Sequence, residues 1–234
     1  PIRNELGITH GQFGNIYAMA TIISSILLIW VGKKIDEYQI FYYSFFVIIL
    51  LFLSSLFFSF INSIFFLAIG IFLMRFSGQG LMSHTSTTTI SRFFEKSRGK
   101  ALSTIWFGLS SAEFILPVFV TYFFVIYSWR TVWQGIAIII ILFLPIVIFN
   151  TIRSVKLESR EKDQNPKINL KIKSWRRVEV IKDFRFYIVS LNMLAMPWVA
   201  TGVFVYQSFI TESKMWSIYT IPKAFMVYSI TSIV

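Results

Sequence analysis

Residues 40–61 read IFYYSFFVIILLFLSSLFFSFI and contain no charged side chain. A helix needs about 20 mostly apolar residues to cross the ~30 Å hydrocarbon core of a bilayer, and a soluble core helix rarely runs that long without charge. Comparable runs occupy residues 16–31, 64–83, 102–127, 132–149, 186–210 and 218–234. Because these runs lack the alternation of a lipid-facing barrel strand, we expect an all-α, polytopic membrane helical bundle.

The few charges are concentrated on one side of the expected membrane. The net charge is +11, and most of the 22 Lys and Arg residues fall in three connections, residues 32–39, 91–101 and 151–185. The positive-inside rule therefore predicts that these loops are cytoplasmic and that the protein is integral to the cell (inner) membrane. The basic excess follows from topology and can favour anionic lipid, so we do not expect nucleic-acid binding.

The longest polar segment divides the chain. We predict an N-terminal transmembrane bundle in residues 1–150, a cytoplasmic linker in residues 151–185, and the start of a second bundle in residues 186–234. From Ile168 the linker has the composition of either an interfacial helix or a solvated basic loop. The chain begins at Pro1 and ends inside an apolar run, so we expect a fragment. With no cysteine and two histidines far apart in sequence, we expect no metal site and no cofactor.

A series of short motifs carries a resemblance. GKKID follows the first span, RFSGQG lies in the third, SRFFEKSRGKAL enters the fourth, GLSSAEFILP lies within it, and YSWRTVW precedes the fifth. This series resembles the N-terminal half of a major facilitator superfamily transporter, with monocarboxylate and oxalate/formate porters as the nearest subgroup. The resemblance implies that the spans are helices two to seven and the start of helix eight of twelve, and that helix one and the C-terminal helices are absent.

The resemblance also implies a conformational motif at the first basic loop. Gly32 and Asp36 match the family spacing, whereas Glu37 and Gln39 stand where basic and glycine residues are common. A glycine at a helix end permits an unusual turn or a close approach, and Asp36 can pair with nearby cytoplasmic cations. Two further candidates for this motif, predicted to form a tight basic turn, are Arg98 and Gly99.

Arg75 lies inside the third apolar run. A charge within a span costs at least ~2.5–3.5 kcal/mol on insertion scales, so we expect it to face the bundle interior. Helical spacing puts Gln79, Ser83 and Ser86 on its face, while Gly78 and Gly80 would let a neighbouring helix approach closely. This polar face is a candidate substrate site.

Glu113 lies at a similar depth in the next span. It could form an intramembrane ion pair with Arg75, either structural or functional, or it could carry a coupled proton while Arg75 holds an anion. Asn192 in the sixth span is a further candidate for the substrate path. His84 and His10 are weaker candidates for proton transfer.

The hypothesis that best covers these features is a secondary active transporter. It would move a small solute, an organic anion such as a carboxylate, by alternating access, with proton symport implied by the resemblance. A membrane-embedded enzyme would need an acid/base or metal constellation that the sequence lacks, and a seven-span receptor rests on span count alone. We therefore expect that the protein is not an enzyme and that its partners are the solute and the bilayer. The sequence does not determine an oligomeric state.

Overall fold

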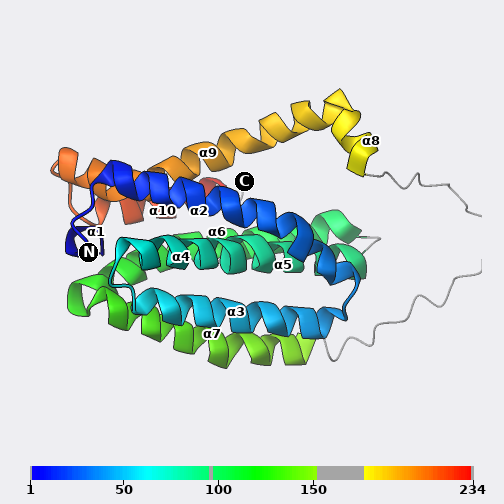
Figure 1. The fold of residues 1–234 in the computed structure, drawn as a ribbon, viewed down its shortest axis with the longest axis horizontal. Coiled ribbons are helices and arrows are strands. Elements are labelled where there is room, and N and C mark those ends of the chain that lie inside the picture. The colour runs from blue at the N-terminus through cyan, green and yellow to red at the C-terminus, as the bar shows by residue number, and fades with distance from the viewer. Residues whose placement is uncertain (1, 95–96, 152–176, 233–234) are drawn as a thin grey trace, which may run out of the picture.

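The computed structural model describes residues 2–94, 97–151 and 177–232, and these residues form helices and short connections (Figure 1). Most of the candidate interfacial helix from Ile168 lies outside the described residues. In chain order the elements are α1 (Ile2–Glu5), α2 (His10–Val31), the 3₁₀ turn η1 (Gly32–Asp36), α3 (Ile40–Ser59), α4 (Ile64–Met74), the π-helical segment η2 (Arg75–Met82), α5 (Ser83–Phe93), α6 (Arg98–Ile126), α7 (Trp129–Thr151), α8 (Arg177–Lys182), α9 (Phe184–Ser213) and α10 (Thr220–Thr231).

Six of the described helices are long and apolar enough to cross a membrane. They are His10–Asp36, Ile40–Ser59, Ile64–Phe93, Arg98–Ile126, Trp129–Asn150 and Phe184–Ser213. The prediction of an all-α membrane bundle is confirmed. The seventh apolar run contributes the shorter helix α10.

The third span continues ten residues beyond the predicted end at residue 83, through a stretch rich in serine and threonine. Some of its hydroxyls bond back to the preceding turn: Thr85 donates to the Leu81 carbonyl at 2.7 Å and Ser86 donates to the Met82 carbonyl at 2.9 Å, whereas the buried Thr89 hydroxyl has no partner among the described residues. Hydroxyls satisfied in this way need no external partner. Polar composition therefore did not end the helix.

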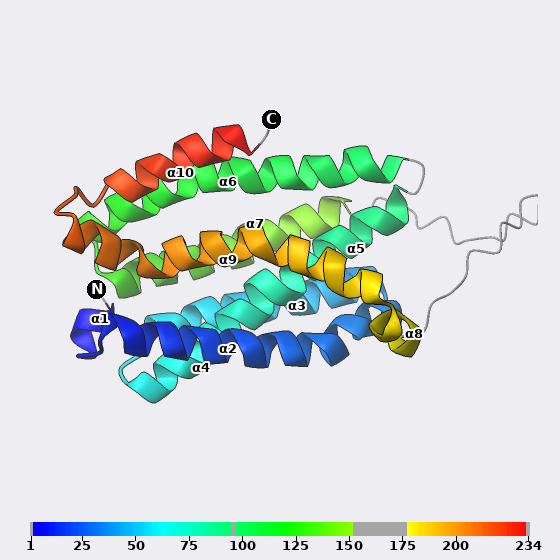
Figure 2. The same cartoon turned by 90° about the horizontal axis from the view of Figure 1, so that it is seen from above.

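The helices pack around α3, whose faces meet α4 and α7, while α2 lies against α4 and η2. Figure 2 shows α6 and α10 side by side along one edge. Small polar residues line the α3 interface: Ser54, Ser55 and Ser77 are buried, and the Ser77 hydroxyl oxygen lies 3.1 Å from that of Ser54. Small side chains of this kind let helices in a membrane approach and hydrogen-bond.

The two ends of the bundle differ in charge. The basic end carries η1, the end of α5 and the start of α6, whereas the opposite end, here called the α1 end, carries α1 and the α6–α7 and α9–α10 connections (Figure 1). Helix α9 lies beside α2 at the α1 end and diverges from α2 toward the basic end (Figure 1).

At the α1 end, the Glu5 carboxylate binds α7. Arg130 donates two hydrogen bonds to it, at 2.9 and 2.6 Å, and the Trp129 indole N–H donates a third at 2.9 Å. Arg130 also donates to the Ile61 carbonyl at 2.9 Å, in the connection between α3 and α4. The hydrogen bonds from Arg130 lower the pKa of Glu5 below its ordinary value, with the Trp129 bond adding to the effect. Glu5 therefore joins three segments distant in sequence.

We predict that Glu5→Gln lowers the midpoint of thermal unfolding in detergent at neutral pH. A carboxyl group whose pKa is lowered on folding stabilises the fold above its ordinary value of ~4.3, and this contribution disappears as the pH falls through the lowered pKa. The difference between wild type and variant should thus shrink in acid. Glu37→Gln, which breaks a local pair with Lys34, serves as the control with a smaller effect; equal effects of both variants would contradict the prediction.

Candidate functional site

Arg75 stands where the third span changes its winding. It caps α4 and begins the π-helical segment η2, which covers the RFSGQG sequence. π-Helical turns are rare and occur frequently at functional sites, because the extra residue per turn redirects side chains and frees backbone groups. The span is therefore irregular at its one charged residue between Ile64 and Ser91.

The guanidinium group of Arg75 lies over the ring of Tyr17 on α2, 4.9 Å from the ring centroid. The side chain is half-buried, and within the described residues it makes no hydrogen bond or ion pair. A guanidinium carries five N–H donors in a planar fork that matches a carboxylate. The contact with the face of Tyr17 leaves those donors available.

Two glycines of η2 lie where neighbouring helices pack. A Cβ atom on Gly78 would lie 3.4 Å from the Leu51 side chain on α3, and one on Gly80 would lie 3.5 Å from the Leu28 side chain on α2. These are ordinary van der Waals distances, so α2 and α3 pack beside η2, but the packing does not require glycine at Gly78 or Gly80. This packing holds η2 between α2 and α3.

The other predicted substrate residues are exposed and separate from Arg75 in hydrogen bonding. Gln79 is exposed on η2, and Asn192 is exposed on α9, where its amide donates to the Ile188 carbonyl at 3.0 Å. Of the predicted stripe, Ser83 is also exposed and Ser86 bonds within its own helix. No hydrogen bond in the described part of the chain joins these side chains to Arg75.

Glu113 faces a different neighbour from the one predicted. It is half-buried on α6, the helix that packs against α10, and its carboxylate is close enough to the Tyr228 hydroxyl to interact with it electrostatically. Arg75 instead faces α2. No ion pair joins Arg75 to Glu113 among the described residues, so the pairing alternative is wrong for this structure, because the two helices turn these residues toward different partners.

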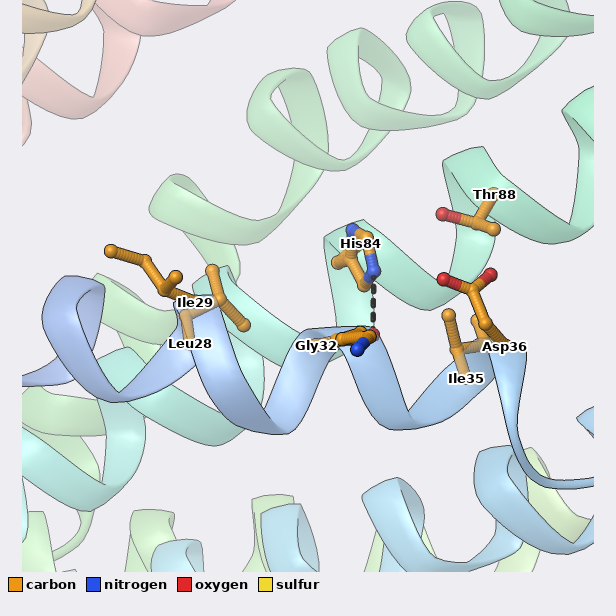
Figure 3. Close-up of a pocket in the computed structure, with 8 residues that line it drawn as sticks. Leu28, Ile29, Gly32, Ile35, Asp36, His84 and Thr88 are labelled. Carbon is orange, nitrogen blue, oxygen red and sulfur yellow. Dashed lines mark hydrogen bonds between the residues drawn. The ribbon is translucent and has the colours of Figure 1, made fainter. Parts of the chain in front are cut away.

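At the basic end, Gly32 packs against His84. The His84 Nε2 lies 3.1 Å from the Gly32 carbonyl oxygen and donates to it, and a Cβ on Gly32 would lie 3.4 Å from the imidazole ring (Figure 3). The backbone at Gly32 is ordinary right-handed helix, with φ −59°. Of the two reasons for a glycine given above, the structure shows the close approach and not an unusual turn.

Asp36 forms an ion pair with Arg92 on α5, and Arg92 also donates to the Ile35 carbonyl at 3.2 Å. Arg92 thereby binds both a carboxylate and an end carbonyl of η1, which joins the end of the first span to the end of the third. An open cavity of about 340 Å³ lies beside this pair. The lining residues, drawn as sticks in Figure 3 and all labelled there except Lys33, are Leu28, Ile29, Gly32, Lys33, Ile35, Asp36, His84 and Thr88.

Arg98 and Gly99 do not form the predicted tight turn. Both lie in the first turn of α6, and Arg98 donates to the Ser91 carbonyl at 3.4 Å. A Cβ on Gly99 would meet no atom within 4 Å. A helix start explains the pattern as well as a turn does, since both expose polar backbone at a membrane surface.

Sequence reasoning missed two contacts at these sites. Tyr17 gave no signal, because an aromatic residue in a span is usually read as lipid-facing or core, and its register relative to Arg75 depends on how α2 packs. Arg92 was one of several basic residues near the first loop, and only the fold selects it over Lys33 and Lys34 as the partner of Asp36.

We predict that Asp36 and Arg92 are energetically coupled. Asp36→Asn and Arg92→Gln should each lower the thermal unfolding midpoint in detergent, and the double variant should lose less than the sum, with a coupling of about 0.2–1 kcal/mol for a pair this exposed. Lys33→Gln combined with Asp36→Asn is the matched control, because Lys33 lies in the same cavity wall but outside the pair. Additive losses from Asp36→Asn and Arg92→Gln would contradict the assignment.

Comparison with known proteins agrees with this architecture. The family model described as Major Facilitator Superfamily matches residues 1–234, the whole chain. Among curated proteins and solved structures, none matches the chain closely enough to add to this assignment. With six candidate membrane spans and a family match over its whole length, the chain belongs to the major facilitator superfamily, a family of secondary transporters.

Proposed function

We propose that this transporter carries a small organic anion, such as a carboxylate, and that Arg75 binds the anion during transport. Membership of the family makes the protein a multi-pass membrane transporter of a small solute. The chemistry of the half-buried cation at η2 supports an anionic solute. The subgroup of monocarboxylate and oxalate/formate porters is part of this proposal.

The observation that carries the proposal is the state of the Arg75 guanidinium. A cation inside a membrane span normally finds a partner, because unpaired charge is costly there. In the described residues Arg75 has an aromatic face but no anion. A carboxylate entering this site would supply the missing charge and accept two parallel hydrogen bonds from the guanidinium fork.

The remaining predicted residues have supporting roles in this proposal. Gln79, on the same helical segment, would offer an amide to the bound acid, and Asn192 would contribute from α9. Glu113, apart from Arg75, would bind the coupled proton in a symport step. Because Glu113 is not paired with Arg75, Glu113 could gain or lose a proton while the anion stays bound to Arg75.

Alternating access gives these residues a common path. We infer that the basic end faces the cytoplasm, since the loops there hold most of the Lys and Arg residues. The contact of α2 with α9 at the α1 end, and their divergence toward the basic end, support a conformation closed at the outer side (Figure 1). The Asp36–Arg92 pair joins segments on the same side of the linker, so it would keep that bundle rigid during the movement.

We predict that Arg75→Ala reduces proton-driven uptake of the transported acid by about 10- to 100-fold, the loss expected when charge-assisted hydrogen bonds worth ~1.5–3 kcal/mol are removed. Uptake of a panel of mono- and dicarboxylates by the full-length protein in proteoliposomes measures this. Arg75→Lys should give an intermediate loss, because lysine keeps the charge but lacks the planar fork.

Two controls separate binding from folding. Lys223→Ala removes an exposed cation of α10 and should leave uptake of the acid unchanged. Tyr17→Phe should transport nearly as well as wild type, whereas Tyr17→Ala should raise KM, since the aromatic face is lost. If the wild type takes up no carboxylate, the anion proposal fails and neutral or cationic solutes become the candidates; uptake unaffected by Arg75→Ala would make this residue a structural charge.

A further inference from the structure

The α1 end holds a cluster in which one carboxylate faces two basic side chains. His10, the first residue of α2, has its Nε2 3.4 Å from one oxygen of Glu212 at the end of α9. Arg3 on α1 has its Nη2 3.4 Å from the other oxygen. The His10 ring also meets the Phe209 ring edge-on, with centroids 5.0 Å apart. The cluster therefore spans the contact between α2 and α9.

One turn deeper, the two helices touch at a glycine. A Cβ atom on Gly14 of α2 would lie 2.4 Å from the hydroxyl oxygen of Tyr206 on α9, closer than any real side chain could approach. Because α9 diverges from α2 toward the basic end (Figure 1), the strength of this contact depends on the few residues at the α1 end. The contact between α2 and α9 therefore combines close packing at Gly14 with the charged cluster one turn nearer the α1 end.

The His10–Glu212 contact is one of charge. Its 3.4 Å separation meets the distance for an ion pair, whereas the only hydrogen bond that Glu212 accepts from these two basic residues comes from Arg3. A neutral imidazole would thus gain little from the carboxylate, while an imidazolium would gain Coulomb energy. The side chains of Arg3 and His10 are 22% and 23% exposed and that of Glu212 is 58% exposed, so solvent weakens the attraction without removing it.

The groups facing His10 can be named. Glu212, Phe209 and, one turn away, Tyr206 come from α9, and Arg3 comes from α1. Glu5, the other acid near α1, is engaged by Arg130 and Trp129. The charge balance at the contact therefore depends on whether His10 carries a proton beside Glu212 and Arg3.

We propose that His10 is a proton-binding site that locks the α1 ends of α2 and α9 together, independently of the site at Arg75. Histidine is the side chain whose charge ordinarily changes between pH 5 and 8. Protonation adds an attraction to Glu212, so the closed α1 end gains stability as the pH falls through this range. By the sidedness inferred above, the proton comes from outside the cell.

The test measures the separation of the two helices directly. Residues 1–234 contain no cysteine, so Asn15→Cys and Ser213→Cys, both at exposed positions, can carry spin labels on α2 and α9 once any cysteine elsewhere in the full-length protein is replaced by serine. Distance distributions from the full-length protein in nanodiscs, recorded by electron–electron double resonance at pH 5.5 and pH 8, give the ratio of close to separated populations. We expect this ratio to be about two- to fivefold higher at pH 5.5, the range for a partly exposed ion pair.

Three variants assign the effect. His10→Phe keeps an aromatic edge against Phe209 but takes no proton, so its ratio should not change between the two pH values. Glu212→Gln should lower the ratio at pH 5.5 and also lose the pH dependence. His84→Phe, at the basic end, is the matched control and should keep it. A wild-type ratio that is the same at both pH values, or a pH dependence that survives His10→Phe, would overturn the proposal. The distance measurement does not require the solute, so the proposal of anion transport can fail without affecting the proposal for His10.

Discussion

Polar groups within the hydrocarbon layer are costly unless they find a partner in the protein, and this constraint shapes the chain from its backbone to its charges. Helices satisfy the backbone internally, which is why the apolar runs fold as they do. The hydroxyls of Thr85 and Ser86 bond back to the preceding turn, so these polar side chains are accommodated in a third span that continues to Phe93. Most of the charged pairs lie at the two ends of the bundle, where water lowers their cost.

Arg75 is a charged residue inside a span whose side chain makes no hydrogen bond or ion pair with the described residues. The residue begins the π-helical segment η2, its guanidinium lies over the Tyr17 ring, and α2 and α3 pack beside Gly80 and Gly78 of the same segment. A cation inside a membrane span whose hydrogen-bond donors are unused is costly unless another group binds it. In a transporter, the solute can be that partner for part of the cycle, which is why we connect this residue with anion binding.

Different interactions join the helices at each end of the bundle. At the basic end, His84 packs on Gly32, and Arg92 binds Asp36 and a carbonyl, so that α2 is joined to α5. At the α1 end, Glu5 joins α1 to α7, while Glu212 connects α1 and α2 with α9. The first set lies on one side of the linker, and the contacts of Glu212 cross it. The packing of α6 against α10 also crosses the linker. Resistance to opening between α2 and α9 at the α1 end would therefore depend on Glu212 and its neighbours.

The sequence by itself determined the membrane class, the helical fold and four of the spans to within a few residues, and it singled out Arg75 as a charge inside a span, because length, apolar continuity and isolated charge are local properties. It also selected Gly32 and Asp36, because helix ends and short spacings are local too. Only the tertiary structure decided that Arg75 faces Tyr17 and not Glu113, that Asp36 binds Arg92, and that His10 meets Glu212. These choices depend on how each helix is rotated about its axis and packed on its neighbours, and segments far apart in the chain fix that rotation together.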